Sequence, residues 1–189
     1  MNSASTDSDP VWKPISRAAL VAWLVFYGLF LVYAARDDSG FLAIDNVNLV
    51  FHEAGHPLFS YFGYTLMILG GTLGELLVPF LIGIYFYRQS PRETGGVAFS
   101  AFWFFENFLY IGTYMADART LALPLVGSGD HDWEILFGQW GLLVHDRDTG
   151  GATRALGWMG MLAAVAWLAW MALRAAPVNL PAKDGVVAT

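Results

Sequence analysis

Residues 65–87 read TLMILGGTLGELLVPFLIGIYFY and are followed by Arg88. A helix that crosses a bilayer needs about 20 predominantly apolar residues, so this stretch predicts a transmembrane helix. Three small residues in its first half, Gly70, Gly71 and Gly74, allow the backbone of a neighbouring helix to approach closely. We therefore expect a membrane helix that packs tightly against a second helix.

The rest of the chain has the composition of a membrane protein. Charged residues make up only 14% of the 189 residues, whereas soluble proteins contain about 25%. Further apolar runs long enough to cross a bilayer cover residues 18–35, 97–116 and about 155–173. We predict an all-α polytopic membrane helix bundle with about four full spans plus a metal-binding helix.

The bundle is expected to form a single transmembrane domain over residues 13–175, with a disordered leader (1–12) and a flexible tail (176–189). Lysine and arginine are enriched in the cytoplasmic loops of membrane proteins. Four spans place one group of basic residues on a common side: Lys13, Arg17, Arg88, Arg92, Arg174 and Lys183. We expect an integral protein of a bacterial inner membrane with a cytoplasmic N-terminus.

Composition also excludes several functions. The chain contains no cysteine, which excludes disulfides and thiolate metal sites and leaves histidine and carboxylate as strong ligands. The net charge is −6 and the sequence has no basic cluster, so nucleic acid is not an expected partner. The lipid bilayer is the partner that composition predicts.

Residues 52–56 read HEAGH and match the HExxH metal-binding pattern. On a helix, His52 and His56 project from one face, so both imidazoles can reach one metal ion while Glu53 meets a water on that ion. The other interpretations are a chance match and a structural pair of histidines. The chain has only four histidines, and two of them in this register favour a metal site.

The segment that carries HEAGH, residues 41–62, is too polar to face lipid on all sides, since it also contains Asp45 and Asn48. Pro57 removes a backbone donor and disfavours helical geometry at His56, which predicts a kink or break just beyond the ligands. We expect a segment that is lined by protein and that either re-enters the membrane or spans it.

A catalytic zinc usually has three protein ligands and one open position, so HEAGH needs a third ligand from elsewhere. One candidate is Asp117, at the end of a polar stripe with helical spacing: Glu106, Tyr110, Thr113 and Asp117. For Tyr110 and Thr113 we favour hydrogen bonds that lock helices together. For Asp117, both ligation and a cap at the helix end are open.

The other candidate is His131, in the loop sequence Asp130-His131-Asp132. Its imidazole nitrogen suits zinc, and the adjacent carboxylates could orient the ring. In the alternative interpretation the loop is solvated and Asp132 caps a helix that begins near Trp133.

Two carboxylic acids, Glu75 and Glu106, lie within the predicted spans, where an ionised group is costly without a partner. Each is expected to be protonated, to bond to a neighbouring side chain, or to line a wet cavity that leads to the metal. A structural role is as consistent with the sequence as a catalytic one.

HEAGH, the residues 57–63 that follow it and the run LGGTLG at 69–74 resemble the intramembrane metalloproteases of the site-two-protease class and their small bacterial relatives. The resemblance implies an HExxH motif in a membrane helix and a third zinc ligand, an Asp, from a later membrane segment. Residues 107–117, NFLYIGTYMAD, are similar to the family's Asn-Pro-Asp-Gly segment and make Asp117 the implied ligand. They differ from it in lacking the prolines, and Ala118 stands where the family has Gly.

The predicted function is a membrane-embedded zinc metallopeptidase whose substrates are membrane proteins or peptides. His52 and His56, with Asp117 or His131, are expected to hold Zn²⁺, and Glu53 to act as general base on a zinc-bound water. The alternative is a non-catalytic metal-binding membrane subunit of a larger complex, which the small size of the chain favours. A di-iron site lacks a second ExxH, and a transporter lacks an internal repeat.

A peptide bond in a membrane-spanning substrate must lose its internal hydrogen bonds before attack. The glycines of residues 70–74 and the break at Pro57 are places where an extended substrate strand is expected to fit. Substrate choice is expected to come from the spans or from a partner protein.

Overall fold

The computed structural model describes residues 11–125 and 130–174, so most of the predicted leader and all of the predicted tail lie outside the described residues. Helices make up the described fold. In chain order they are α1 (Arg17–Arg36), α2 (Asp45–Phe59), the 3₁₀ turn η1 (Ser60–Phe62), α3 (Tyr64–Tyr87), α4 (Thr94–Ala116), α5 (Asp132–Trp140), the 3₁₀ turn η2 (Leu143–His145) and α6 (Asp146–Arg174).

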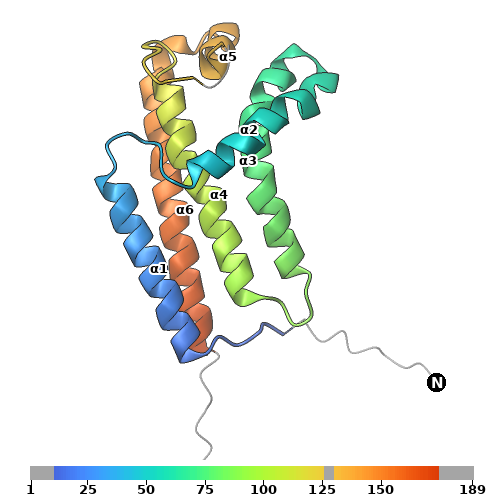
Figure 1. Cartoon of the computed structure of the whole chain (residues 1–189), viewed down its shortest axis with the longest axis vertical. Coiled ribbons are helices and arrows are strands. Elements are labelled where there is room, and N and C mark those ends of the chain that lie inside the picture. Colours follow the sequence, from blue (N-terminus) through green and yellow to red (C-terminus); the bar gives the residue numbers. More distant parts are fainter. Residues whose placement is uncertain (1–10, 126–129, 175–189) are drawn as a thin grey trace, which may run out of the picture.

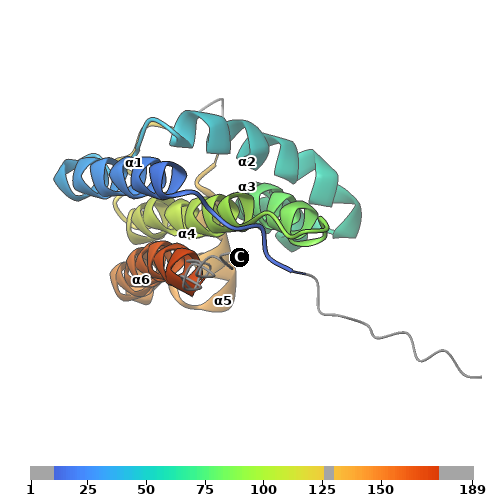
Figure 2. The same ribbon diagram turned by 90° about the horizontal axis from the view of Figure 1, so that it is seen from below.

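The long helices α1, α3, α4 and α6 run along the length of the molecule, and α2 crosses the bundle obliquely towards the end that carries α5 (Figure 1). Seen from below, α4 lies between α1 and α6, and α2 lies over α3 (Figure 2). Three segments are long and apolar enough to cross a membrane: Arg17–Arg36, Tyr64–Tyr87 and Leu143–Arg174. The fold is thus all-helical, as predicted, and has the segments of a membrane protein.

Two apolar clusters hold the helices together. The first joins α1, α4 and α6 through buried side chains such as Tyr27, Phe102 and Met161. The second lies beneath α5, where Leu136 and Phe137 pack with side chains of α3 and α4. The second cluster fixes α5 beside the C-terminal end of α4 and thereby positions the first residue of α5, Asp132.

The last long helix begins earlier than the sequence suggests. The sequence predicts the last span from about residue 155, but α6 begins at Asp146 and includes the glycine-containing residues 149–151. Asp146 is fully buried and accepts a hydrogen bond from Arg119 Nη2 at 2.6 Å. Gly150 lies against Gly112 of α4, where either glycine's Cβ would meet the other's carbonyl oxygen. The glycine therefore serves helix packing and not chain reversal.

At the opposite end, the residues before α1 are fastened to the α3–α4 connection. Trp12 pairs with Arg92 in an isolated bridge, and Lys13 Nζ lies 2.6 Å from Glu93 Oε1. The Arg92 guanidinium also lies 4.0 Å from the centroid of the Tyr87 ring. Basic and aromatic side chains therefore gather at this end of the bundle, as they do at membrane surfaces.

Adjacent glycines of α6 allow a matched test of the α4–α6 contact. Gly150→Ala should lower the free energy of unfolding by about 1–3 kcal/mol, because a methyl group there overlaps the α4 backbone. Gly151→Ala should be neutral or stabilising by up to about 1 kcal/mol, since nothing lies within 4 Å of its Cβ. Thermal unfolding in detergent measures both, and equal stability of the two variants would contradict the contact.

Candidate metal centre

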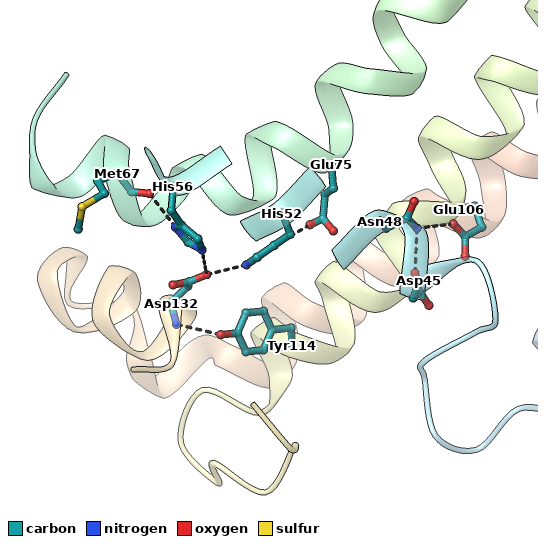
Figure 3. Close-up of polar contacts among 9 residues, drawn as sticks. All are labelled: Asp45, Asn48, His52, His56, Met67, Glu75, Glu106, Tyr114 and Asp132. Atoms are coloured by element: carbon teal, nitrogen blue, oxygen red, sulfur yellow. Dashed lines mark hydrogen bonds and ion pairs between the residues drawn. The ribbon is translucent and has the colours of Figure 1, made fainter. Parts of the chain in front are cut away.

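Three side chains that could hold a metal ion converge near the α5 end of the bundle (Figure 3). His52 and His56 lie one turn apart on α2, and Asp132 is the first residue of α5. The Asp132 Oδ2 atom lies 2.9 Å from His52 Nε2 and 3.5 Å from His56 Nε2. Tetrahedral coordination at about 2.0–2.1 Å separates ligand atoms by about 3.3 Å, so these spacings suit one ion.

The outer nitrogens of both imidazoles face α3. His56 Nδ1 lies 2.9 Å from the Met67 carbonyl oxygen, which can accept its proton. His52 Nδ1 lies 3.6 Å from Glu75 Oε1. Metal-binding histidines commonly donate their second N–H to a carbonyl or carboxylate, which sets the tautomer and leaves the other nitrogen free for the ion. In this site both Nε2 atoms are left for the metal.

Close contact between α2 and α3 creates this arrangement. A Cβ at Gly55 would meet the Gly70 carbonyl oxygen, and one at Gly71 would come within 2.5 Å of His52 Nε2. The HEAGH glycine and the small-residue run of α3 therefore serve the same interface. This corrects the expectation that these glycines provide room for an extended substrate, because α2 already fills the space.

Local structure around Pro57 keeps both histidines on one helix. Pro57 lies inside α2, which ends at Phe59 and continues as the 3₁₀ turn Ser60–Phe62. The change of helix type thus comes three residues after the proline, beyond the expected site of a break directly after His56. His52 and His56 consequently keep the one-turn spacing that a shared ion requires.

Asp132 reaches the histidines because α4 and α5 hold its backbone. Its N–H donates to the Tyr114 hydroxyl at 3.0 Å. His131 precedes it as the N-cap of α5, where His131 Nδ1 accepts from the Glu134 N–H at 3.2 Å. The predicted cap role therefore falls to His131, and Asp132 is free to face the imidazoles.

Asp117 and His131, the two predicted third ligands, lie together but outside the group of His52, His56 and Asp132. His131 Nε2 is 3.6 Å from Asp117 Oδ2. Asp117 accepts hydrogen bonds from the Thr120 hydroxyl and from the backbone N–H groups of Ala122 and Leu123. These bonds turn the carboxylate into its own loop, which explains why it does not face the metal group.

The charges of these two residues follow from their surroundings. Burial acts to raise the pKa of Asp117, but the hydrogen bonds from Thr120, Leu123 and Ala122 outweigh it, so the pKa lies below its ordinary value. Burial lowers the pKa of His131. The lowered pKa of Asp117 favours its ionised form, and the lowered pKa of His131 favours its neutral form.

A cavity of about 690 Å³ adjoins the three residues. Its walls include the metal group, Glu53, Tyr110 and Tyr114, together with apolar side chains of the α4–α5 loop, Leu123, Pro124 and Leu125. Cavities of roughly 300–1,000 Å³ accommodate small ligands or short peptide segments. The proposed general base thus lines the same cavity as the candidate ligands.

Glu106, the second acidic residue predicted within the spans, lies away from the two histidines and bonds to a different part of α2. Glu106 Oε2 accepts from Asn48 Nδ2 at 3.2 Å, and the same amide group donates to Asp45 Oδ1 at 3.0 Å. Asn48 Oδ1 accepts from Trp103 Nε1 at 2.8 Å. Glu106 therefore joins α2 to α4, whereas Glu75 lies beside His52.

Comparison of the chain with protein families, with curated protein sequences and with solved structures finds no match. The resemblance to site-two proteases therefore rests on the chain's own residues. The chemistry of the described residues is the basis for assigning a function.

Substitutions at Asp132 and Asp117 should show which of the two carboxylates binds the metal ion. Asp132→Ala should weaken binding of Zn²⁺, used as a probe ion, by more than the roughly 10–100-fold that loss of an outer-shell partner costs. Asp117→Asn should leave the affinity nearly unchanged, because that carboxylate bonds to its own loop. Competition with a chromogenic chelator measures both, and the opposite order of effects would exclude Asp132 as the ligand.

A second pair of variants tests the role of α3. Glu75→Gln should lower Zn²⁺ affinity by about 10–100-fold, since a neutral amide orients and polarises His52 less well. Glu106→Gln is the control, because that buried carboxylate bonds to Asn48 and not to a histidine. Equal affinities of the two variants in the chelator assay would show that Glu75 does not support the site.

Proposed function

We propose that this protein is a membrane-embedded zinc metallopeptidase that hydrolyses peptide bonds of membrane-associated substrates. The observation that carries the proposal is the convergence of two imidazole nitrogens and one carboxylate oxygen at a cavity that Glu53 also lines. Three protein ligands and one open position are typical of catalytic zinc. Structural zinc has four protein ligands, and Asp117 and His131 are engaged elsewhere.

The donor set supports zinc as the ion. Two imidazoles and one carboxylate form the ligand set of several zinc peptidases, and the chain contains no cysteine to form a thiolate site. When bound, zinc lowers the pKa of a coordinated water to about 7 and polarises a substrate carbonyl. The side chains around the cavity would supply the remaining steps.

Glu53 would accept a proton from the water as the water oxygen attacks the carbonyl carbon of the scissile bond. The same carboxyl group would then return the proton to the amide nitrogen as the C–N bond breaks, which yields a carboxylate and an amine. His52 and His56 would keep their orientation through Glu75 and the Met67 carbonyl oxygen. The apolar loop around Pro124 would limit access of bulk water.

We further propose that α1, α3, α4 and α6 cross the membrane and that α2 enters and leaves at the side that carries α5. Exposed apolar side chains of α2, among them Val47, Val50 and Leu58, support contact with lipid. The start of α1 and the α3–α4 connection lie at the far end of the bundle from α5 (Figure 1). The basic side chains of Lys13 and Arg92 belong to these segments. The N-terminus would then be cytoplasmic, and the metal centre would lie in the outer half of the membrane.

Glu53→Gln tests the proposed hydrolysis. The variant should keep its affinity for Zn²⁺, because Glu53 is not one of the three ligands, but its turnover should fall by at least about 100-fold as the general base is lost. Cleavage of quenched fluorescent transmembrane peptides in proteoliposomes measures turnover. Glu134→Gln, on the neighbouring α5, is the control and should cleave normally; undiminished turnover of Glu53→Gln would falsify the assignment.

A further inference from the structure

Tyr114 of α4 occupies a special place beside the metal centre. Its ring lines the cavity and lies near two histidine rings, with centroid separations of 6.2 Å to His52 and 4.1 Å to His131. Its hydroxyl oxygen accepts the N–H of Asp132 at 3.0 Å. The hydroxyl therefore lies next to the residue that supplies the third ligand (Figure 3).

The hydrogen-bonding capacity of this hydroxyl is only partly used. A phenol oxygen can accept hydrogen bonds and donate one of its own. The Asp132 N–H occupies the acceptor side, and among the described residues no group accepts the Tyr114 proton. Because the Asp132 N–H must be the donor in that contact, the Tyr114 O–H is available to a molecule in the cavity.

We propose that Tyr114 donates this hydrogen bond to the carbonyl oxygen of the scissile peptide bond. The inference rests on the function proposed above. When the water oxygen bonds to the carbonyl carbon, the π electrons of the C=O bond move to that oxygen, which becomes negatively charged. The Tyr114 hydroxyl stabilises this charge without giving up its proton, and the bond weakens again when the C–N bond breaks.

The chain offers a matched control in Tyr110, one turn earlier on α4. Its ring also lines the cavity and is nearly parallel to that of Tyr114, with centroids 6.1 Å apart. It packs edge-on against Phe41 at 5.0 Å. Tyr110 thus shares the surroundings of Tyr114 but lacks its contact with the backbone of Asp132.

The test compares Tyr114→Phe with Tyr110→Phe in purified full-length protein. Three quantities are measured: Zn²⁺ affinity, kcat and KM on the quenched transmembrane peptides, and the Kd of a phosphinic peptide that mimics the charged tetrahedral oxygen. At saturating Zn²⁺, Tyr114→Phe should lower kcat by about 10²–10³-fold and weaken the phosphinic peptide by a similar factor, with KM unchanged. Its Zn²⁺ affinity should fall by a smaller factor, because the variant loses the hydrogen bond to the Asp132 N–H but keeps all three ligands. Tyr110→Phe should change none of these by as much as tenfold.

Each other outcome overturns the inference. Undiminished kcat in Tyr114→Phe would exclude a catalytic role for Tyr114. A loss of Zn²⁺ affinity large enough to account for the loss of kcat would exclude it as well, because Tyr114 would then act only by positioning Asp132. A wild-type protein that binds Zn²⁺ but cleaves none of the peptides overturns the proposed peptidase function first, and the role of Tyr114 with it. A similar loss of kcat in Tyr114→Phe and Tyr110→Phe would show that either hydroxyl change disturbs the cavity in general, which would exclude a specific role for Tyr114.

Discussion

The close approach of α2 to α3 at Gly55, Gly70 and Gly74 is the constraint on which the candidate metal centre depends. Because backbone atoms of the two helices are in contact, the His52 ring lies directly over Gly71 and its Nδ1 faces Glu75. The same proximity brings His56 Nδ1 to the Met67 carbonyl oxygen. A bulkier interface would move α2 outward and remove both imidazoles from the groups that orient them.

Buried polar groups on the other side of α2 fix its distance from α4. Asn48 joins Asp45 and Glu106 through one amide group, and accepts from Trp103. A polar group left unpaired in an apolar environment costs several kcal/mol, so such contacts resist separation of the helices. With α3 behind it and α4 beside it, α2 presents His52, Glu53 and His56 to the cavity between α2, α4 and the loop before α5.

The sequence predicted those features of the structure that depend only on residues close together in the chain. The apolar run of α3 lies within a single helix, and so do His52 and His56 of the HExxH motif on α2. The structure contains both features. The third ligand depends on how the α4–α5 loop folds. The sequence favoured Asp117 or His131 and gave Asp132 only as a helix cap or as a carboxylate that orients His131, whereas the structure groups Asp132 with His52 and His56. The difference lies in loop hydrogen bonds. The Asp117 carboxylate accepts bonds from its own loop, whereas His131 caps α5 and the buried Asp132 carboxylate faces the imidazoles. The start of α6 was predicted about nine residues too late for a related reason, since a glycine at a helix contact, such as Gly150, and one in a turn look the same in sequence.

X-ray absorption at the zinc K-edge of the zinc-loaded wild-type protein identifies the ligands of the ion, because it reports the atoms that bind the metal. We expect four ligands, with two imidazole nitrogens at about 2.0–2.1 Å and oxygen atoms from Asp132 and a water at about 2.0–2.2 Å. A spectrum with three imidazoles would place His131 at the ion, and a spectrum with fewer than two would remove HEAGH from the site. Either result would contradict the assignment of His52, His56 and Asp132.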